Sequence, residues 1–198
     1  MPTRSFNVYS EKVVVYPNET FYWFANASAL ENGNVSVQSS DWPLSPAAPV
    51  LTSQSPSVSV TVSNEAGAPS SYTFSCTPTD SDVTTQTLII ARQYVSNLCN
   101  DVEIYAGDHF IWHNTGSLAV TIKPDTDNPE NWPLSQAQYD LAPGDWVAVE
   151  VPSDAEAFPP GYILDIVYSN GSQPCQDLAT QPKLVVGGGP VPAAKPGK

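Results

Sequence analysis

The two histidines of the chain, His109 and His113, are the first residues to consider for metal or acid–base chemistry. They are four residues apart, so in an extended strand they share one face, about 13 Å from each other at ~3.3 Å per residue. That distance is too long for a shared zinc ion, whose ligands lie ~2 Å from the metal. We therefore expect polar strand residues here and no metal pair.

The three cysteines, Cys76, Cys99 and Cys175, are too few for a disulfide framework. Cys76 follows an apolar stretch, which is typical of a buried and inert thiol. Cys99 and Cys175 could join the start of the second half of the chain to its last loop. A disulfide requires their Cα atoms to lie within ~7 Å, and the sequence leaves this open.

An acidic loop contains Asp125, Asp127 and Glu130, and oxygen-rich loops can hold calcium. The spacing is not that of an EF-hand, because Pro129 and Glu130 occupy positions that would need a ligand and the turn glycine. A solvated loop is the simpler interpretation, so we predict no metal and no cofactor.

No catalytic motif is found in the sequence. It has no Gly-x-Ser-x-Gly elbow, no phosphate loop, no His-Glu-x-x-His and no Cys-x-x-Cys. With two His and seven basic residues, few catalytic triads can be assembled. We therefore predict no catalytic residues and a protein that is not an enzyme.

The composition favours an all-β globular protein. Valine, threonine and aromatic residues are plentiful and suit half-buried strands, whereas helix-forming residues are scarce. The net charge is −13, from 7 Lys and Arg and 20 Asp and Glu. Such a surface repels phosphate, which argues against nucleic-acid and anionic-membrane partners.

The sequence has no membrane-spanning or export segment. No apolar run approaches the ~20 residues of a spanning helix, and Met1–Ser5 does not begin a signal peptide. At face value the protein is cytoplasmic; it is secreted or on a surface if the chain is a mature fragment. Matches to the glycosylation pattern would favour secretion but arise often by chance in a Ser/Thr-rich chain; they begin at Asn18, Asn26, Asn34 and Asn170.

An internal repeat at an offset of about 90 residues is the strongest signal in the sequence. Trp42-Pro43-Leu44-Ser45 recurs identically as Trp132-Pro133-Leu134-Ser135, and Phe21-Tyr22-Trp23 recurs as Phe110-Ile111-Trp112. We expect two homologous domains with a short link at 93–96 and a flexible Gly/Pro/Ala/Lys tail. Their predicted ranges are 5–92 and 97–187, with the tail at 188–198.

Both copies show period-two alternation in short runs separated by turn residues. In Val58-Ser59-Val60-Thr61-Val62 three valines share one face and hydroxyls the other, and Val147, Val149 and Val151 repeat the valine stripe. About seven such strands in about 90 residues are typical of a Greek-key sandwich. The predicted fold class is all-β, with two tandem antiparallel Greek-key β-sandwich domains.

The second copy resembles the cupredoxin family. Gly107-Asp108 leads into Phe110-Ile111-Trp112-His113-Asn114, an aromatic-x-Trp-x-Asn strand, and Pro143-Gly144 resembles that family's turn before a valine strand. In the first copy, the strand ending at Cys76 is similar to the one that delivers the copper cysteine. Immunoglobulin-like sandwiches share much of this pattern.

The resemblance implies a type 1 copper site, which needs two His and a Cys thiolate. The family's first His position falls within 115–122 or 25–37, and neither segment contains a histidine. Thr77-Pro78-Thr79-Asp80 follows Cys76 without His or Met, and Ile166 stands at the cysteine position of the second copy. The expected sandwiches are therefore metal-free.

Aromatic residues that the two copies do not share are better candidates for binding than the shared ones. Trp146 alternates against the valine stripe, and its counterpart is Ser57. Tyr22 and Phe24 alternate against the core positions of their strand. An aromatic ring off the core packs at an interface or stacks on a ligand. Packing between the domains is the simpler interpretation; the interface or ligand candidates are Trp146, Tyr22, Phe24 and His113.

These features predict a non-enzymatic structural or assembly protein that self-associates or docks on a larger particle or surface. The expected partner is protein, without nucleic acid or membrane insertion. A carbohydrate or small-ligand binding module that uses Trp146 is the alternative. An atypical copper or redox protein is the second alternative.

Overall fold

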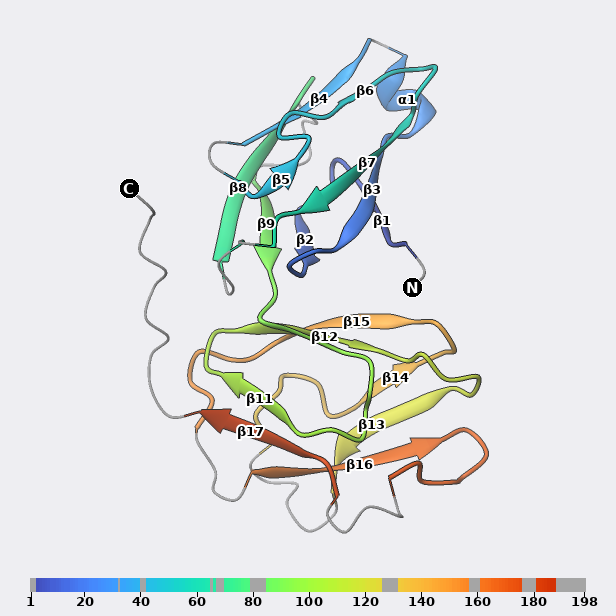
Figure 1. The fold of residues 1–198 in the computed structure, drawn as a ribbon, viewed down its shortest axis with the longest axis vertical. Coiled ribbons are helices and arrows are strands. Elements are labelled where there is room, and N and C mark those ends of the chain that lie inside the picture. Colours follow the sequence, from blue (N-terminus) through green and yellow to red (C-terminus); the bar gives the residue numbers. More distant parts are fainter. Residues whose placement is uncertain are drawn as a thin grey trace. The chain divides into compact units, whose positions relative to one another are not determined.

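In the computed structural model the regular secondary structure is almost entirely β-strand (Figure 1). The structure describes residues 3–31, 33–39, 42–64, 66, 70–78, 85–125, 132–156, 161–175 and 181–187. Within these residues the only helix is α1 (Ala27–Leu30), and no helix is long and apolar enough to cross a membrane. The chain divides into two compact units, Met1–Ala91 and Arg92–Lys198.

The first unit contains two sheets. One has the strand order β1 (Ser5–Asn7), β3 (Thr20–Phe24), β7 (Ser57–Val62), β5 (Leu44–Ser45). The other has the order β2 (Lys12–Val15), β9 (Gln86–Ile90), β8 (Ser70–Thr77), β4 (Val35–Gln38), β6 (Val50–Leu51). The strand faces buried between the sheets form the core.

The second unit has a similar strand order, but its first sheet has three strands where that of the first unit has four. Its first sheet is β10 (Gln93–Val95), β12 (His109–His113), β15 (Trp146–Glu150). Its second sheet is β11 (Val102–Tyr105), β17 (Lys183–Gly187), β16 (Tyr162–Tyr168), β13 (Val120–Pro124), β14 (Tyr139–Leu141). The predicted all-β sandwich class is confirmed.

Two features of the sheets differ from the sequence prediction. The segment expected as a link at 93–96 forms β10, which pairs with β12. The sheets are also mixed, because β1–β3, β10–β12, β2–β9 and β11–β17 are parallel pairs. A parallel pair needs a crossover connection, and between β1 and β3 the chain crosses to the other sheet to form β2.

Period-two burial explains why these strands form a core. In β3, Phe21 and Trp23 are fully buried, whereas Thr20 and Tyr22 on the opposite face are exposed. The rings of Phe21 and Trp23 meet edge to face at 5.3 Å, and Phe74 of β8 lies 5.3 Å from Trp23. In β12, Phe110 and Trp112 occupy the corresponding core positions, 4.8 Å apart.

Candidate functional site

The outward side of the sheet β1-β3-β7 carries two aromatic residues surrounded by small polar side chains. Because side chains alternate along a strand, the residues opposite the core stripe of β3 and β7 point out of the sandwich. We call these residues of the three strands the hydroxyl–aromatic face: Ser5, Asn7, Thr20, Tyr22, Phe24, Ser57, Ser59 and Thr61.

Strand register sets the arrangement on this face. Tyr22 lies between Ser5 on β1 and Ser59 on β7, and Tyr22 itself is 41% exposed. Phe24, which is half-buried, lies between Asn7 and Ser57. The result is a row of aromatic rings with a polar side chain on either side of each.

The end of the row is fixed by a hydrogen bond, 3.0 Å long, between the hydroxyls of Thr20 and Thr61. These hydroxyls, like the serine hydroxyls of the face, can donate and accept hydrogen bonds.

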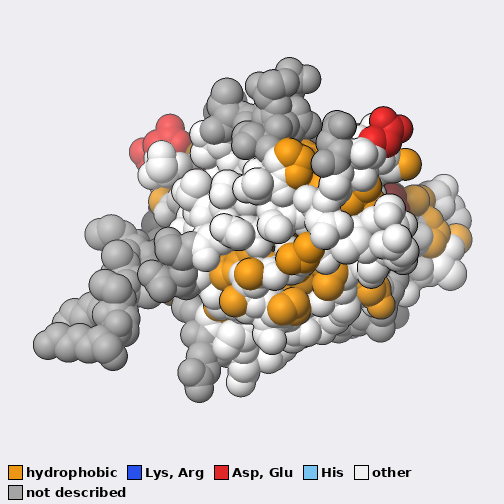
Figure 2. All heavy atoms as spheres, turned by 90° about the horizontal axis from the view of Figure 1, so that it is seen from above, with side chains coloured by type: hydrophobic (Ala, Val, Ile, Leu, Met, Phe, Trp, Pro, Cys, Tyr) orange, Lys and Arg blue, Asp and Glu red, His pale blue; other side chains and the backbone are white. Residues whose placement is uncertain are grey.

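Every member of the hydroxyl–aromatic face is uncharged, although the chain carries a net charge of −13. The face therefore offers hydrogen bonds and ring surfaces but no carboxylate, amino, guanidinium or imidazole group. At the end of this unit where β4, β6 and α1 lie, hydrophobic side chains cover more of the visible surface than acidic ones (Figure 2).

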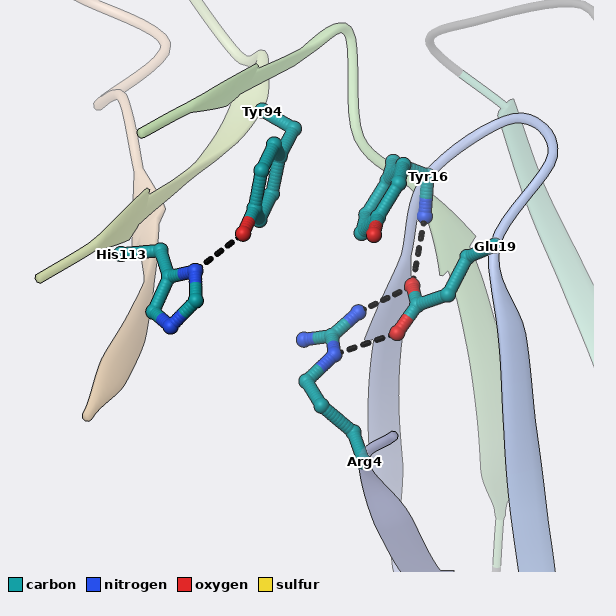
Figure 3. A network of polar contacts seen from close by, with 5 residues as sticks. All are labelled: Arg4, Tyr16, Glu19, Tyr94 and His113. Carbon is teal, nitrogen blue, oxygen red and sulfur yellow. Dashed lines mark hydrogen bonds and ion pairs between the residues drawn. The ribbon is translucent and has the colours of Figure 1, made fainter. Parts of the chain in front are cut away.

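A buried ion pair holds β1, β3 and β7 in place beneath the face. The guanidinium of Arg4 donates two hydrogen bonds to the carboxylate of Glu19, and the Tyr16 backbone N–H donates a third, 3.1 Å long (Figure 3). The backbone of Arg4 accepts the N–H of Tyr22 at 2.9 Å, and that of Glu19 accepts the N–H of Val62 at 2.8 Å. Burial raises the pKa of Glu19, and the Arg4 hydrogen bonds and charge oppose that rise.

A similar arginine–carboxylate ion pair occurs at the start of the second unit. Arg92 forms an ion pair with Asp108, and its guanidinium lies 4.5 Å from the ring centre of Tyr105. Arg4 likewise lies 5.6 Å from the ring centre of Tyr16. The sequence prediction missed these residues, although the signal was present: the chain's two arginines each precede a Tyr-x-x-Glu or Tyr-x-x-Asp motif.

The residues at the matching positions of the second unit are buried. In β12, His109, Ile111 and His113 are all buried, at 9%, 0% and 4% exposure. Nδ1 of His113 is hydrogen-bonded to the Tyr94 hydroxyl (Figure 3), and Nε2 of His109 lies 3.5 Å from a carboxylate oxygen of Glu150.

Trp146 lies opposite His113 in the β12–β15 register and is only half-buried, on the side away from the valine stripe. The structure therefore brings together two of the candidate residues, Trp146 and His113, while Tyr22 and Phe24 form the open face of the other unit.

The cysteine pair left open by the sequence is joined in the structure. Cys99 and Cys175 form a disulfide with their Cα atoms 5.5 Å apart. Beside it lies an uncharged cavity of about 360 Å³, whose lining includes Ser96, Thr115 and Tyr168. Cys76 is a buried free thiol whose Sγ donates to the Val8 carbonyl at 3.1 Å, and burial raises the pKa of this thiol to about 11.

Thiol reactivity tests this assignment. The native protein is expected to react with no thiol-specific reagent at pH 8, because the thiolate of Cys76 is both inaccessible and disfavoured. Denaturation without reduction should expose one thiol, and reduction should raise the count to three. Reduction should also lower the free energy of unfolding of the second unit by about 2–4 kcal/mol. Three thiols before reduction would show that the disulfide is absent.

The residues around Cys76 do not fit a type 1 copper site. The Sγ atom faces the Val8 carbonyl, which also accepts the amide of Gln86 at 2.6 Å. The chain's two imidazoles both belong to β12 of the other unit. Among the described residues no group of three or more His, Cys, Asp or Glu is placed to hold a metal ion. Of the acidic loop, Asp125 follows β13, and Asp127 and Glu130 lie outside the described residues.

Comparison with known proteins gives only distant structural similarities. No protein-family model matches the chain, and no curated protein matches its sequence. Among solved structures, a Cu-containing nitrite reductase from Thermus scotoductus SA-01 is 13% identical over 89% of this chain and 54% of its own, with a TM-score of 0.30.

Two further solved structures are similarly distant. Lac15 from a marine microbial metagenome is 9% identical over 94% of this chain and 61% of its own, with a TM-score of 0.29. Fet3p, a multicopper oxidase that functions in iron import, is 10% identical over 94% of this chain and 49% of its own, with a TM-score of 0.27. The chain thus spans about half to three-fifths of these proteins, and the function must be argued from its own residues.

Proposed function

We propose that the chain is a non-enzymatic docking protein that attaches to a larger particle or surface through the hydroxyl–aromatic face. The observation that carries this proposal is the exposed Tyr22 on an uncharged sheet face of a strongly acidic chain. Charge elsewhere keeps the molecules soluble and apart, so an uncharged face is where close approach costs least.

The same face is a poor surface for association between copies of the chain. Self-association is driven mainly by buried apolar area, and interface cores are enriched in large apolar side chains. Only Tyr22 and Phe24 of the face are of that kind, and Phe24 is already half-buried. We therefore place docking ahead of self-association within the assembly function.

Sedimentation with insoluble envelope material from the producing cells tests the proposal. The intact chain is expected to pellet saturably with that material, and Ser59→Glu is expected to abolish pelleting by placing a charge beside Tyr22. Val50→Glu is the matched control, because Val50 is 48% exposed and lies on β6 of the other sheet. If the chain does not pellet, or if both variants behave alike, the proposed function is wrong.

A further inference from the structure

The hydroxyl–aromatic face has the chemistry of a surface that binds sugars. Six of its eight members are Ser, Thr or Asn, which can donate and accept hydrogen bonds, and the other two are aromatic. Sugar rings present the complementary groups: apolar C–H faces that stack on an aromatic ring and hydroxyls in the plane of the ring. A surface with aromatic rings at its centre and hydrogen-bonding side chains on both sides can bind the C–H face and the hydroxyls of a sugar at once.

The spacing of the groups supports this match. Tyr22 and Phe24 are two residues apart on β3, which corresponds to about 7 Å along the strand. Ser5 and Ser59 lie on the neighbouring strands, about 5 Å to either side of Tyr22. A sugar ring stacked on Tyr22 would therefore have a hydroxyl within reach on both sides, and the next ring of a chain would extend toward Phe24.

The charges of the chain favour a neutral polysaccharide over other polymers as the ligand of this face. Nucleic acids and acidic polysaccharides would be repelled by a chain of net charge −13. A basic protein would be attracted to the acidic side chains, and none of these lies on the face. An apolar protein surface would fit poorly, because only two of the eight residues of the face are aromatic and the other six are polar.

Side-chain contacts connect the strands of the face before any ligand arrives. The Thr20–Thr61 hydrogen bond and the Arg4–Glu19 pair fix three strands in one register. Binding to a prearranged surface loses less conformational entropy, which matters for a shallow site with few contacts.

We propose that the hydroxyl–aromatic face binds a neutral polysaccharide, with Tyr22 stacking on one sugar ring and Ser5 and Ser59 hydrogen-bonding its hydroxyls. This inference rests on the proposed docking function and names the chemistry of the surface. It places the sugar site on the first unit, whereas the sequence alternative placed it at Trp146, which lies opposite the buried His113.

Co-sedimentation with purified cellulose, chitin and xylan tests the inference. The chain is expected to bind at least one of them saturably. The affinity should be unchanged between 0.05 and 0.5 M NaCl, because salt screens charged contacts and the face has none. Tyr22→Ala should weaken binding by about tenfold or more, because it removes one aromatic stacking contact and the area buried by it. Leu118→Ala, which removes an exposed apolar residue of the second unit, should leave binding unchanged.

Absence of binding to all three polysaccharides overturns the inference, as does binding that Tyr22→Ala leaves intact. Treating the envelope material separates this failure from failure of the proposed function. Retention that survives protease and is lost after periodate oxidation supports the polysaccharide. Retention that survives periodate and is lost after protease keeps the docking function and rejects the polysaccharide.

Discussion

Replacing Arg4 with methionine is expected to lower the free energy of unfolding of the first unit by about 3–5 kcal/mol, the usual cost of breaking a buried ion pair from one side. Both side chains of the pair are nearly inaccessible, at 6% and 3% exposure. Methionine fills part of the volume but leaves the carboxylate of Glu19 buried with only the Tyr16 N–H. Hydrogen exchange read by mass spectrometry can assign the loss to amides of β1, β3 and β7.

Two further variants separate the charge effect from a packing effect. Arg4→Met combined with Glu19→Leu should recover most of the lost stability, because no charge is then left buried. Arg92→Met in the second unit should cost only about 1 kcal/mol, since the Arg92 side chain is 25% exposed and solvent screens its pair with Asp108. Equal losses in Arg4→Met and in the double variant would show that the ion pair itself is not what stabilises the unit.

The destabilisation by Arg4→Met should depend on pH. Without Arg4, burial raises the pKa of Glu19 further above its unfolded value, because the two effects of Arg4 that lower it are gone. A carboxyl with a raised folded-state pKa contributes stability below its unfolded pKa and loses that contribution as the pH rises. The free energies of unfolding of the variant and the parent protein should therefore differ least at about pH 4 and most at neutral pH. The opposite trend would contradict the assignment of Glu19 as the buried partner.

The strands and the core could be predicted because alternation is a local signal. Phe21 and Trp23, like Phe110 and Trp112, occur at period two between turn residues, and their burial follows. The parallel strand pairs could not be predicted in this way. Nothing in the residues 93–95 themselves shows that they pair with β12, because strand pairing depends on how the crossover packs and not on the strand's own pattern.

The candidate site was predicted only in part, for a related reason. Alternation shows that Tyr22, Trp146 and His113 lie off the core stripe of their strands, but it does not show what covers the outward side. His113 is 4% exposed and hydrogen-bonded to Tyr94, whereas Tyr22 is 41% exposed between two serines. Ser5 and Ser59 are far apart in the sequence, and only the register brings them to the same ring.

Replacing Trp23 with alanine is expected to lower the free energy of unfolding of the first unit by about 3–5 kcal/mol, a large share of the roughly 5–15 kcal/mol of an ordinary domain. Trp23 is fully buried and contacts the rings of Phe21, Phe74 and Phe6. Trp112→Ala should have an effect of the same size in the second unit, where Trp112 contacts Phe110 and Tyr139. Exchange measurements should show loss of protection in β3 and β7 for one variant and in β12 and β15 for the other.

The conservative variant Trp23→Phe tells cavity formation from loss of a polar contact. The indole Nε1 of Trp23 is buried without a hydrogen-bond partner among the described residues, so phenylalanine removes a buried donor that gains nothing from its position. The smaller ring leaves only a limited void, and the net cost should be about 1–2 kcal/mol. If Trp23→Phe is as damaging as Trp23→Ala, the indole N–H is bonded in the folded protein. If Trp23→Ala is neutral, the ring is not in the core, and Tyr22 on the opposite side of the strand cannot be the exposed residue of the hydroxyl–aromatic face.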